Sequence, residues 1–193
     1  MTMAIPTSPD QLLAHLERLG IRTRTVQHPP VFTVEEAKAL RGDLPGGHIK
    51  NLFLRNKKGE MWLVVAEESR PIDLKALGER LGAGRLSFGS PERLMAYLGV
   101  VPGAVTPFAL INDRDGQVKA ALDKAILDQD PVNCHPLTND MTTAIAPRDL
   151  LAFIASSGHE AMIIDLGNGT AYPPAEGCLR GSGAPSMRPK AKR

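Results

Sequence analysis

A predicted β-hairpin constrains the fold of this chain more than any other feature. Residues 51–55 (NLFLR) and 61–66 (MWLVVA) are short runs of mainly apolar side chains, and the polar residues 56–59 (NKKG) separate them. Runs of this length around a glycine-containing turn are typical of two antiparallel strands. A tight hairpin argues against a purely parallel, doubly wound sheet, in which strands and helices alternate regularly.

N-cap patterns predict helices on both sides of the hairpin. Ser8 with Gln11 forms a capping-box pattern ahead of a stripe of leucines, and Gly20 follows the stripe. Thr33 with Glu36 repeats the pattern and predicts a second helix to about residue 40. Asp73, Ser90-Pro91 and Pro147 are typical helix starts, which predicts further helices over residues 74–81, 91–98 and 147–155.

The remaining apolar runs are predicted to be strands. Because these runs do not alternate regularly with the helices, we expect an α/β fold with a single mixed, largely antiparallel sheet flanked by helices. The predicted strands lie over residues 23–27, 108–111, 118–122, 132–135, 141–145 and 162–166.

Length and composition predict one domain followed by a tail. The chain has 193 residues, of which 42% are hydrophobic and 23% charged, as in ordinary globular proteins. We expect the folded domain to span residues 1–167. Glycine, proline, serine and basic residues dominate residues 168–193, which predicts a mobile C-terminal tail.

Composition also argues against several classes of function. The net charge of +2 is too small to indicate a nucleic-acid binder by itself, and 4% aromatic residues do not predict a base-stacking platform. Cys134 and Cys178 form no CxxC pair, and the five histidines show no helical i, i+4 spacing, so no metal site is predicted. The sequence shows no signal peptide and no membrane-length apolar run, which predicts a cytoplasmic protein without a membrane partner.

Three positions could carry chemistry, and each also has an ordinary structural interpretation. Lys50 enters the first hairpin strand, where it could bind a ligand or simply be a strand-edge lysine. His135 begins the polar segment HPLTN, which could be a binding segment or a turn. Cys134 could be a nucleophile, but adjacent strand residues point to opposite faces, so His135 cannot activate it. A buried structural cysteine is the favoured interpretation.

Taken together, these segments resemble one family. Lys50 begins a KNLFL strand that precedes a Lys-Lys-Gly turn, residues 103–107 (GAVTP) match a GxxxP loop, and His135-Pro136 is followed by Thr138-Asn139. Their order and spacing are similar to those of the YbaK/ProX-like aminoacyl-tRNA deacylases, which include the editing domain of prolyl-tRNA synthetase. The resemblance covers about residues 8–167. It implies hydrolysis of mischarged tRNA-Pro without a cofactor, and prolyl-tRNA synthetase is a second candidate partner.

The resemblance also implies a substrate and a set of site residues. The KNLFL form is most similar to the branch that clears alanine, whereas a deacylase for cysteine or serine and a non-catalytic binding paralogue are the alternatives. Lys50 and His135 would be the catalytic residues, although His135 could serve only to shape the pocket. Asn51 and the GxxxP loop would bind the aminoacyl group, and the basic residues of the hairpin would bind tRNA. The implied loop residues are Gly103, Ala104, Val105, Thr106 and Pro107, and the implied tRNA-binding residues are Arg55, Lys57 and Lys58.

Overall fold

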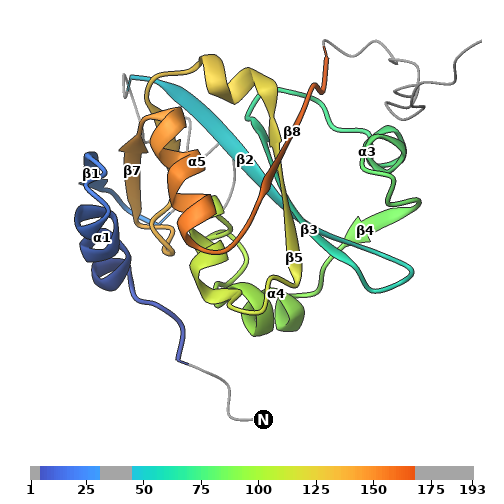
Figure 1. Ribbon diagram of the computed structural model, residues 1–193, viewed down its shortest axis with the longest axis horizontal. Coiled ribbons are helices and arrows are strands. Elements are labelled where there is room, and N and C mark those ends of the chain that lie inside the picture. The colour runs from blue at the N-terminus through green and yellow to red at the C-terminus, as the bar shows by residue number, and fades with distance from the viewer. Residues whose placement is uncertain (1–4, 31–44, 168–193) are drawn as a thin grey trace, which may run out of the picture.

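A computed structural model describes residues 5–30 and 45–167 (Figure 1). The helix predicted from Thr33, the predicted tail over residues 168–193 and Cys178 all lie outside the described residues. The division into a domain and a tail therefore stays a prediction.

The described residues form a mixed sheet of eight strands, as predicted. Its order is β1-β7-β6-β2-β3-β5-β8, and β4 pairs with β2 beside this path. Four strand pairs are antiparallel and three are parallel. The strands are β1 (Thr23–Gln27), β2 (Gly47–Asn56), β3 (Met61–Glu67), β4 (Leu86–Phe88), β5 (Val118–Asp123), β6 (Val132–Cys134), β7 (Met141–Ile145) and β8 (Ala161–Ile164).

The predicted hairpin is confirmed as β2 and β3, and the side chain of Asn56 organises its turn. The Asn56 Oδ1 accepts hydrogen bonds from the backbone N–H groups of Lys58 (2.9 Å) and Glu60 (3.1 Å). Gly59 has a φ of +86°, which a residue with a side chain rarely adopts. The turn sequence therefore fixes the register of the two strands.

Within residues 5–30 and 45–167, four α-helices and two 3-10 helices flank the sheet, and the caps predicted at Ser8, Asp73 and Ser90 are present. Ser8 forms a capping box with Gln11, and Asp73 and Ser90 cap the two following helices. The helices are α1 (Pro9–Arg18), α3 (Leu74–Arg80), α4 (Pro91–Leu98) and α5 (Pro147–Ser156), with 3-10 helices η1 (Pro107–Asn112) and η2 (Lys124–Asp128).

One predicted strand is wrong, because residues 108–111 lie in the 3-10 helix η1. Pro107 occupies the first turn, and the Thr106 Oγ1 accepts a hydrogen bond from the Phe108 N–H (3.3 Å), so the chain starts a helix here. A short apolar run does not distinguish a buried strand from a buried helical turn. The strand β4 and the helix η2 were not predicted.

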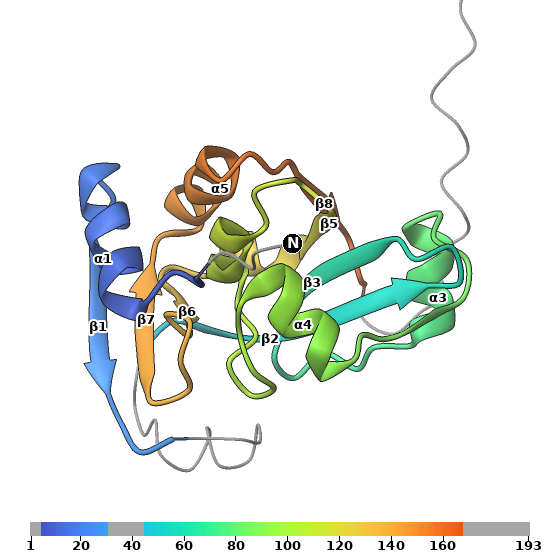
Figure 2. The ribbon, with the colours of Figure 1, turned by 90° about the horizontal axis from the view of Figure 1, so that it is seen from below.

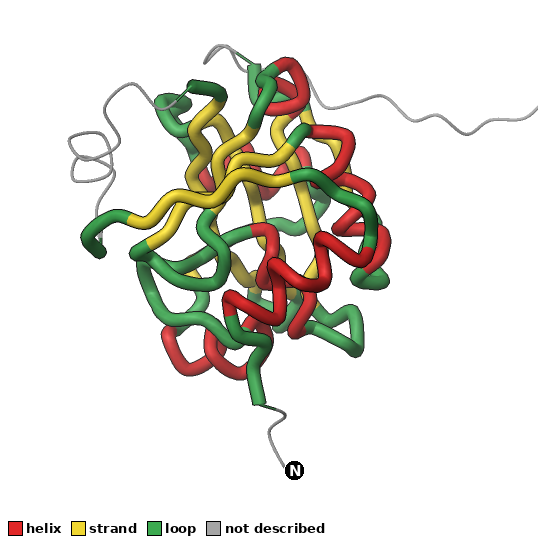
Figure 3. The backbone as a smooth tube through the Cα atoms, turned by 90° about the vertical axis from the view of Figure 1, so that its left-hand side faces the viewer, coloured by secondary structure: helices red, strands yellow, loops and turns green. Residues whose placement is uncertain are grey.

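The hydrophobic core lies on both faces of the hairpin. Along β2, Phe53 packs in a large cluster with leucines of α1 and α4 and with Phe153 of α5, whereas Leu54 packs in a smaller cluster with Leu77 of α3. Figures 1 and 2 show α1 and α3 at opposite ends of the sheet, and Figure 3 shows the strands crossing the middle of the molecule. Side chains that follow each other in β2 therefore face different surroundings.

Candidate active site

Lys50 and His135 lie on the same face of the sheet, where β2 meets β6. The parallel pairs are Gly47 with Val132 and His48 with Asn133. Continuing this register by two residues places His135 beside Lys50. Ile49 precedes Lys50 and Cys134 precedes His135, and both pack in or against the large core cluster. Because neighbouring strand residues face opposite sides, Lys50 and His135 face away from this cluster. The register thus places the two residues expected to be catalytic on the same face of the sheet.

The Lys50 ammonium is held at the end of the hairpin by the segment that follows β3. Its Nζ donates a hydrogen bond to the backbone carbonyl oxygen of Arg70. The Arg70 Nε lies 2.6 Å from the Asp123 Oδ2, and the Asp123 side chain is 1% exposed. The buried ion pair fixes Arg70, and Arg70 in turn positions the Lys50 side chain.

Asn51 faces the opposite side of β2 from Lys50. It pairs across the hairpin with Val65, and Ile49, Phe53 and Val65 all pack in or against the large core cluster. The Asn51 Oδ1 is buried and has no hydrogen-bond partner within the described part of the chain. A buried acceptor without a partner costs about 1–3 kcal/mol, so a ligand that donates a hydrogen bond here would recover that free energy.

The GxxxP loop (residues 103–107) connects α4 to η1 and has a fixed backbone. Gly103 has a φ of +90°, which favours glycine. Ala104 is 1% exposed, and its N–H donates a hydrogen bond to the Val101 carbonyl oxygen (3.0 Å). Because the Ala104 N–H is already hydrogen-bonded within the turn, it cannot donate to the aminoacyl group. Ala104 is therefore excluded from the backbone donors expected in this loop.

The GxxxP loop packs on the core cluster that Asn51 faces. Ala104 belongs to this cluster, and Val105 and Leu137 pack against it. Leu137 lies in the turn between β6 and β7, two residues after His135. Figure 2 shows this turn and the loop after α4 extending toward the same side of the molecule. The loop and Asn51 thus lie on the face of β2 that carries the large core cluster, and Lys50 lies on the opposite face.

His135 forms a small polar group with His28 and Thr142. The His135 Nδ1 lies 2.9 Å from the Met141 carbonyl oxygen, and the His28 Nε2 lies 2.9 Å from the Thr142 Oγ1. The two imidazole rings are 6.2 Å apart between centroids. A carbonyl oxygen only accepts hydrogen bonds, so the His135 Nδ1 carries the proton in the neutral ring and Nε2 is the acceptor nitrogen.

Burial lowers the pKa of His135, and the neighbouring His28 lowers it further, while the Met141 carbonyl oxygen opposes both effects. The neutral ring is therefore the favoured form at pH 7. A neutral imidazole whose Nε2 accepts hydrogen bonds can position or deprotonate a water molecule.

The lowered pKa predicts a specific pH dependence of stability. The unfolded chain has the higher histidine pKa, about 6.5, so it binds more protons than the folded protein just below that pH. The contribution of neutral His135 is then fully present above pH 6.5 and is lost as the pH falls. We expect the stability advantage of the wild type over His135→Gln to shrink between pH 8 and pH 5 in urea unfolding. A difference that stays constant over this range would contradict the pKa assignment.

The basic residues of the hairpin lie away from Lys50. Lys57 and Lys58 are exposed in the turn, and Arg55 pairs with Ser87 of β4. At about 3.3 Å per residue, the turn is roughly 20 Å from Lys50. Figure 1 places it at the opposite end of β2 from β7. The structure therefore does not bring these predicted tRNA-binding residues to the end of the sheet where Lys50 and His135 lie.

Cys134 is a core residue. It is 1% exposed, and burial raises the pKa of its thiol far above the ordinary value. A thiol in this environment is not an activated nucleophile. Within residues 5–30 and 45–167, no group of three histidine, cysteine, aspartate or glutamate side chains could hold a metal ion.

The sequence interpretation missed the neighbours of His135. His28 and Thr142 were not among the predicted site residues. The strand β1 pairs antiparallel with β7, and Val26 lies opposite Thr142, which brings His28 to this group. A long-range strand pairing of this kind leaves no local signal in one sequence.

Comparison with protein families identifies the domain. A family model described as the aminoacyl-tRNA editing domain matches residues 28–153. The chain belongs to this family. The matched segment includes Lys50, Asn51, the GxxxP loop and His135.

Named relatives extend over nearly the whole editing domain. The chain is 41% identical over 164 residues to the mouse prolyl-tRNA synthetase associated domain-containing protein 1, covering 80% of this chain and 96% of that protein. It is 36% identical over 156 residues to the prolyl-tRNA editing protein ProX of Acetoanaerobium sticklandii, covering 80% of this chain and 95% of that protein. A more distant relative is the multifunctional Ser/Thr-tRNA deacylase ProXp-y of Escherichia coli K12, 29% identical over 102 residues, with 51% of this chain and 61% of that protein covered.

Solved structures confirm the fold. A protein provisionally assigned as a trans-editing enzyme for prolyl tRNA synthetase superposes with a TM-score of 0.64 at 24% identity, covering 85% of this chain and all of that chain. The hypothetical protein APE2540 superposes with a TM-score of 0.65 at 20% identity, covering 80% and 97% of the two chains. Among the described residues, no helix is long and apolar enough to span a membrane.

Proposed function

We propose that this editing domain is a trans-acting hydrolase that deacylates mischarged tRNA-Pro, with alanyl-tRNA-Pro as its substrate. The observation that carries the proposal is the buried Asn51 Oδ1, which has no partner in the described structure and faces the core cluster that holds the GxxxP loop. The free α-amino group of an aminoacyl ester is a hydrogen-bond donor, so it would satisfy this oxygen. The relative named ProX, a prolyl-tRNA editing protein, supports the tRNA part of the proposal.

The chemical need for a second pocket explains the choice of alanine. Alanine is smaller than proline, so a synthetase pocket built for proline cannot exclude it sterically, and missing methylene groups provide only about 1–3 kcal/mol of discrimination. A smaller hydrolytic pocket accepts alanine and excludes proline. The loop from Gly103 to Pro107 would form one wall, because its left-handed glycine and its buried Ala104 and Thr106 give it a fixed shape.

The reaction in this proposal is attack by water on the ester carbonyl carbon. The ribose 2′-hydroxyl of the terminal adenosine helps to position or activate the water. The tetrahedral intermediate then collapses, and the ribose oxygen leaves with a proton. Lys50 would contact the 3′-terminal phosphate or ribose, and His135 would bind the water or shape the pocket through Nε2.

Two alternatives lead to different results in the same assay. A deacylase for serine or cysteine is supported by the relative named as a Ser/Thr-tRNA deacylase, although only 51% of this chain matches it. A binding protein without hydrolytic activity would bind tRNA-Pro and leave every ester intact.

The proposed function predicts that the purified chain hydrolyses alanyl-tRNA-Pro and that Gly103→Ala lowers the rate at least tenfold. An alanine at a φ of +90° costs about 1–2 kcal/mol and shifts the loop away from the ester. Gly158→Ala is the matched control, because Gly158 has a φ of +80° and a Cβ added there would meet no atom within 4 Å. Release of labelled alanine measures the rate. Intact alanyl-tRNA-Pro after incubation with the wild type would rule out the proposed activity, and equal losses in the two variants would remove the GxxxP loop from the site.

A further inference from the structure

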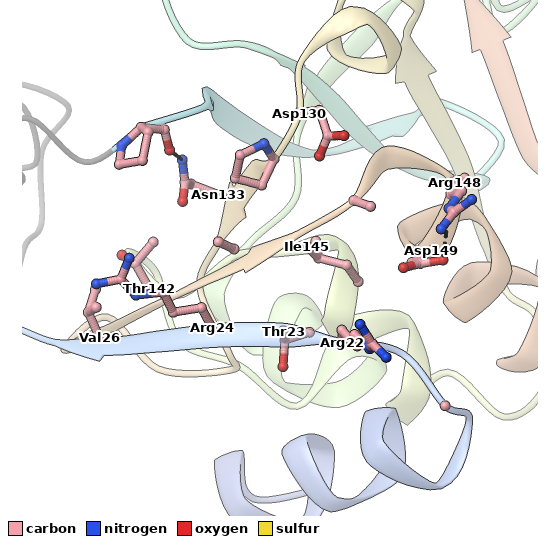
Figure 4. A pocket seen from close by; sticks show the side chains of 15 residues that line it. Arg22, Thr23, Arg24, Val26, Asp130, Asn133, Thr142, Ile145, Arg148 and Asp149 are labelled. Carbon is pink, nitrogen blue, oxygen red and sulfur yellow. Dashed lines mark hydrogen bonds and ion pairs between the residues drawn. The ribbon is translucent and has the colours of Figure 1, made fainter.

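A pocket of about 600 Å³ lies on the outer face of the part of the sheet formed by β1, β7 and β6 (Figure 4). None of the residues implied by the family resemblance lines it. Its charged residues are three arginines and two aspartates. They are Arg22, Arg24, Arg148, Asp130 and Asp149. We call this cavity the arginine pocket.

The local sequence places the three arginines around one cavity. Arg22 immediately precedes β1 and Arg24 is the second residue of this strand, so the two side chains project to the same side. Arg148 lies in the first turn of α5, and its side chain is 89% exposed. Figure 4 shows Arg22 and Arg148 at one end of the pocket, whereas the Arg24 side chain runs along the sheet toward Thr142.

Two further features of the pocket suit an anion that also carries a hydrogen-bond donor. The N-terminus of α5 contributes Ala146 to the lining and has no side-chain cap, so its positive end faces the cavity. Asn133 is 5% exposed, and its Nδ2 donates hydrogen bonds to the carbonyl oxygens of Pro45 and Gly47. The Asn133 Oδ1 is buried at the pocket wall and has no hydrogen-bond partner among the described residues.

The arginine pocket adjoins the polar group formed by His28, Thr142 and His135. Thr142 lines the pocket, and its Oγ1 is 2.9 Å from the His28 Nε2. The His28 ring in turn lies beside His135. Asn133, which also lines the pocket, lies two residues before His135 on β6 and its extension, so both face the side of the sheet that carries Lys50. A polymer bound at Lys50 and His135 can therefore extend into the pocket.

We propose that the arginine pocket binds the backbone of the tRNA 3′ strand at a nucleotide that precedes the terminal adenosine, an inference that rests on the proposed function. A phosphodiester carries one negative charge per nucleotide, which suits arginines separated along a groove. The two aspartates among the arginines disfavour a compact polyanion such as a triphosphate. A ribose hydroxyl or a base amino group supplies the donor for Asn133, and RNA is the ligand that offers both kinds of group in one strand.

A single-stranded RNA that ends in CCA and carries no amino acid tests this pocket without any hydrolysis. Binding of the fluorescently labelled oligonucleotide is measured by anisotropy between 50 and 200 mM KCl. We expect Arg24→Ala and Arg148→Ala each to weaken binding about tenfold, as the loss of a charge-assisted hydrogen bond does. The slope of log K against log salt should fall by about 0.7 for each lost phosphate contact. Arg93→Ala is the matched control, because Arg93 is exposed on α4 and does not line the pocket.

The possible results separate this inference from the proposed function. If Arg24→Ala and Arg148→Ala bind like Arg93→Ala, the pocket does not bind RNA, whether or not the wild type deacylates tRNA. If inorganic phosphate displaces the oligonucleotide at an equal concentration of phosphate groups, the pocket is a small-anion site and the proposal is wrong. If the two pocket variants lose binding and the wild type hydrolyses no mischarged tRNA, the pocket stands and the proposed function fails.

Discussion

Lys50→Ala is expected to lower kcat/KM for alanyl-tRNA-Pro by about 100-fold, because it removes a fixed cation from the site. Lys50 lies on the same face of the sheet as His135 when the register of β2 and β6 is extended, and its Nζ is oriented by the Arg70 carbonyl oxygen. A preorganised cation stabilises charge in the transition state without a cost for reorganisation. The same cation attracts the phosphate of the terminal nucleotide, so both binding and the chemical step should weaken.

Two control variants separate this role from a structural one. Lys50→Arg keeps the charge and should recover part of the activity, since arginine can also bind phosphate. Lys75→Ala removes an exposed lysine from the first turn of α3, and the rate should change less than threefold. Circular dichroism and thermal unfolding establish whether each variant is folded. A folded Lys50→Ala protein with nearly wild-type kcat/KM would exclude Lys50 from the active site.

Local signals in the sequence predicted most of the fold. The turn at residues 56–59, the capping box at Ser8 and the N-caps Asp73 and Ser90 each depend on contacts within a few residues, and the structure confirms them. The run over residues 108–111 was assigned wrongly, because burial alone gives the same apolar pattern in a strand and in a 3-10 turn. The short strand β4 is paired only through residues 54–56 of β2, a contact that local patterns do not record.

Motifs in the sequence select candidate site residues but do not predict how the fold arranges them. Motif order identified Lys50, Asn51 and His135, but strand alternation puts Lys50 and Asn51 on opposite faces of β2. The sequence also grouped Arg55 with the site, although the hairpin carries it away from Lys50. The pairing of β1 with β7 and of β6 with β2 gathers His28, Thr142 and the arginine pocket, and these pairs join residues more than 80 positions apart.

The second large effect is expected in substrate selectivity: alanyl-tRNA-Pro should be hydrolysed about 10- to 100-fold faster than prolyl-tRNA-Pro. Exclusion by size is strong only when the wall of a pocket cannot move. The GxxxP loop meets this condition in the described structure, because Ala104, Thr106 and Pro107 are buried, the Ala104 N–H is bonded within the turn, and Gly103 holds a left-handed conformation. Accommodating the larger proline ring would require this buried loop to shift, and overpacking of this kind typically costs about 1–3 kcal/mol.

A panel of tRNA-Pro charged with alanine, serine, cysteine or proline measures this selectivity under identical conditions. Serine and cysteine are only slightly larger than alanine, and a pocket without a dedicated polar partner rejects an added hydroxyl by about 100-fold at most. Their esters should therefore be hydrolysed more slowly than the alanyl ester and faster than the prolyl ester.

Faster hydrolysis of the seryl ester than of the alanyl ester would instead indicate a polar group that binds the hydroxyl, and the alternative specificity would be correct. Equal rates for alanine and proline would mean that the loop yields, so that size exclusion could not protect the correct product. If the wild type hydrolyses both esters at equal rates, only a variant with a more rigid loop should become selective, because the side chains of the loop are already buried. The order of the four rates thus tests the fixed wall directly.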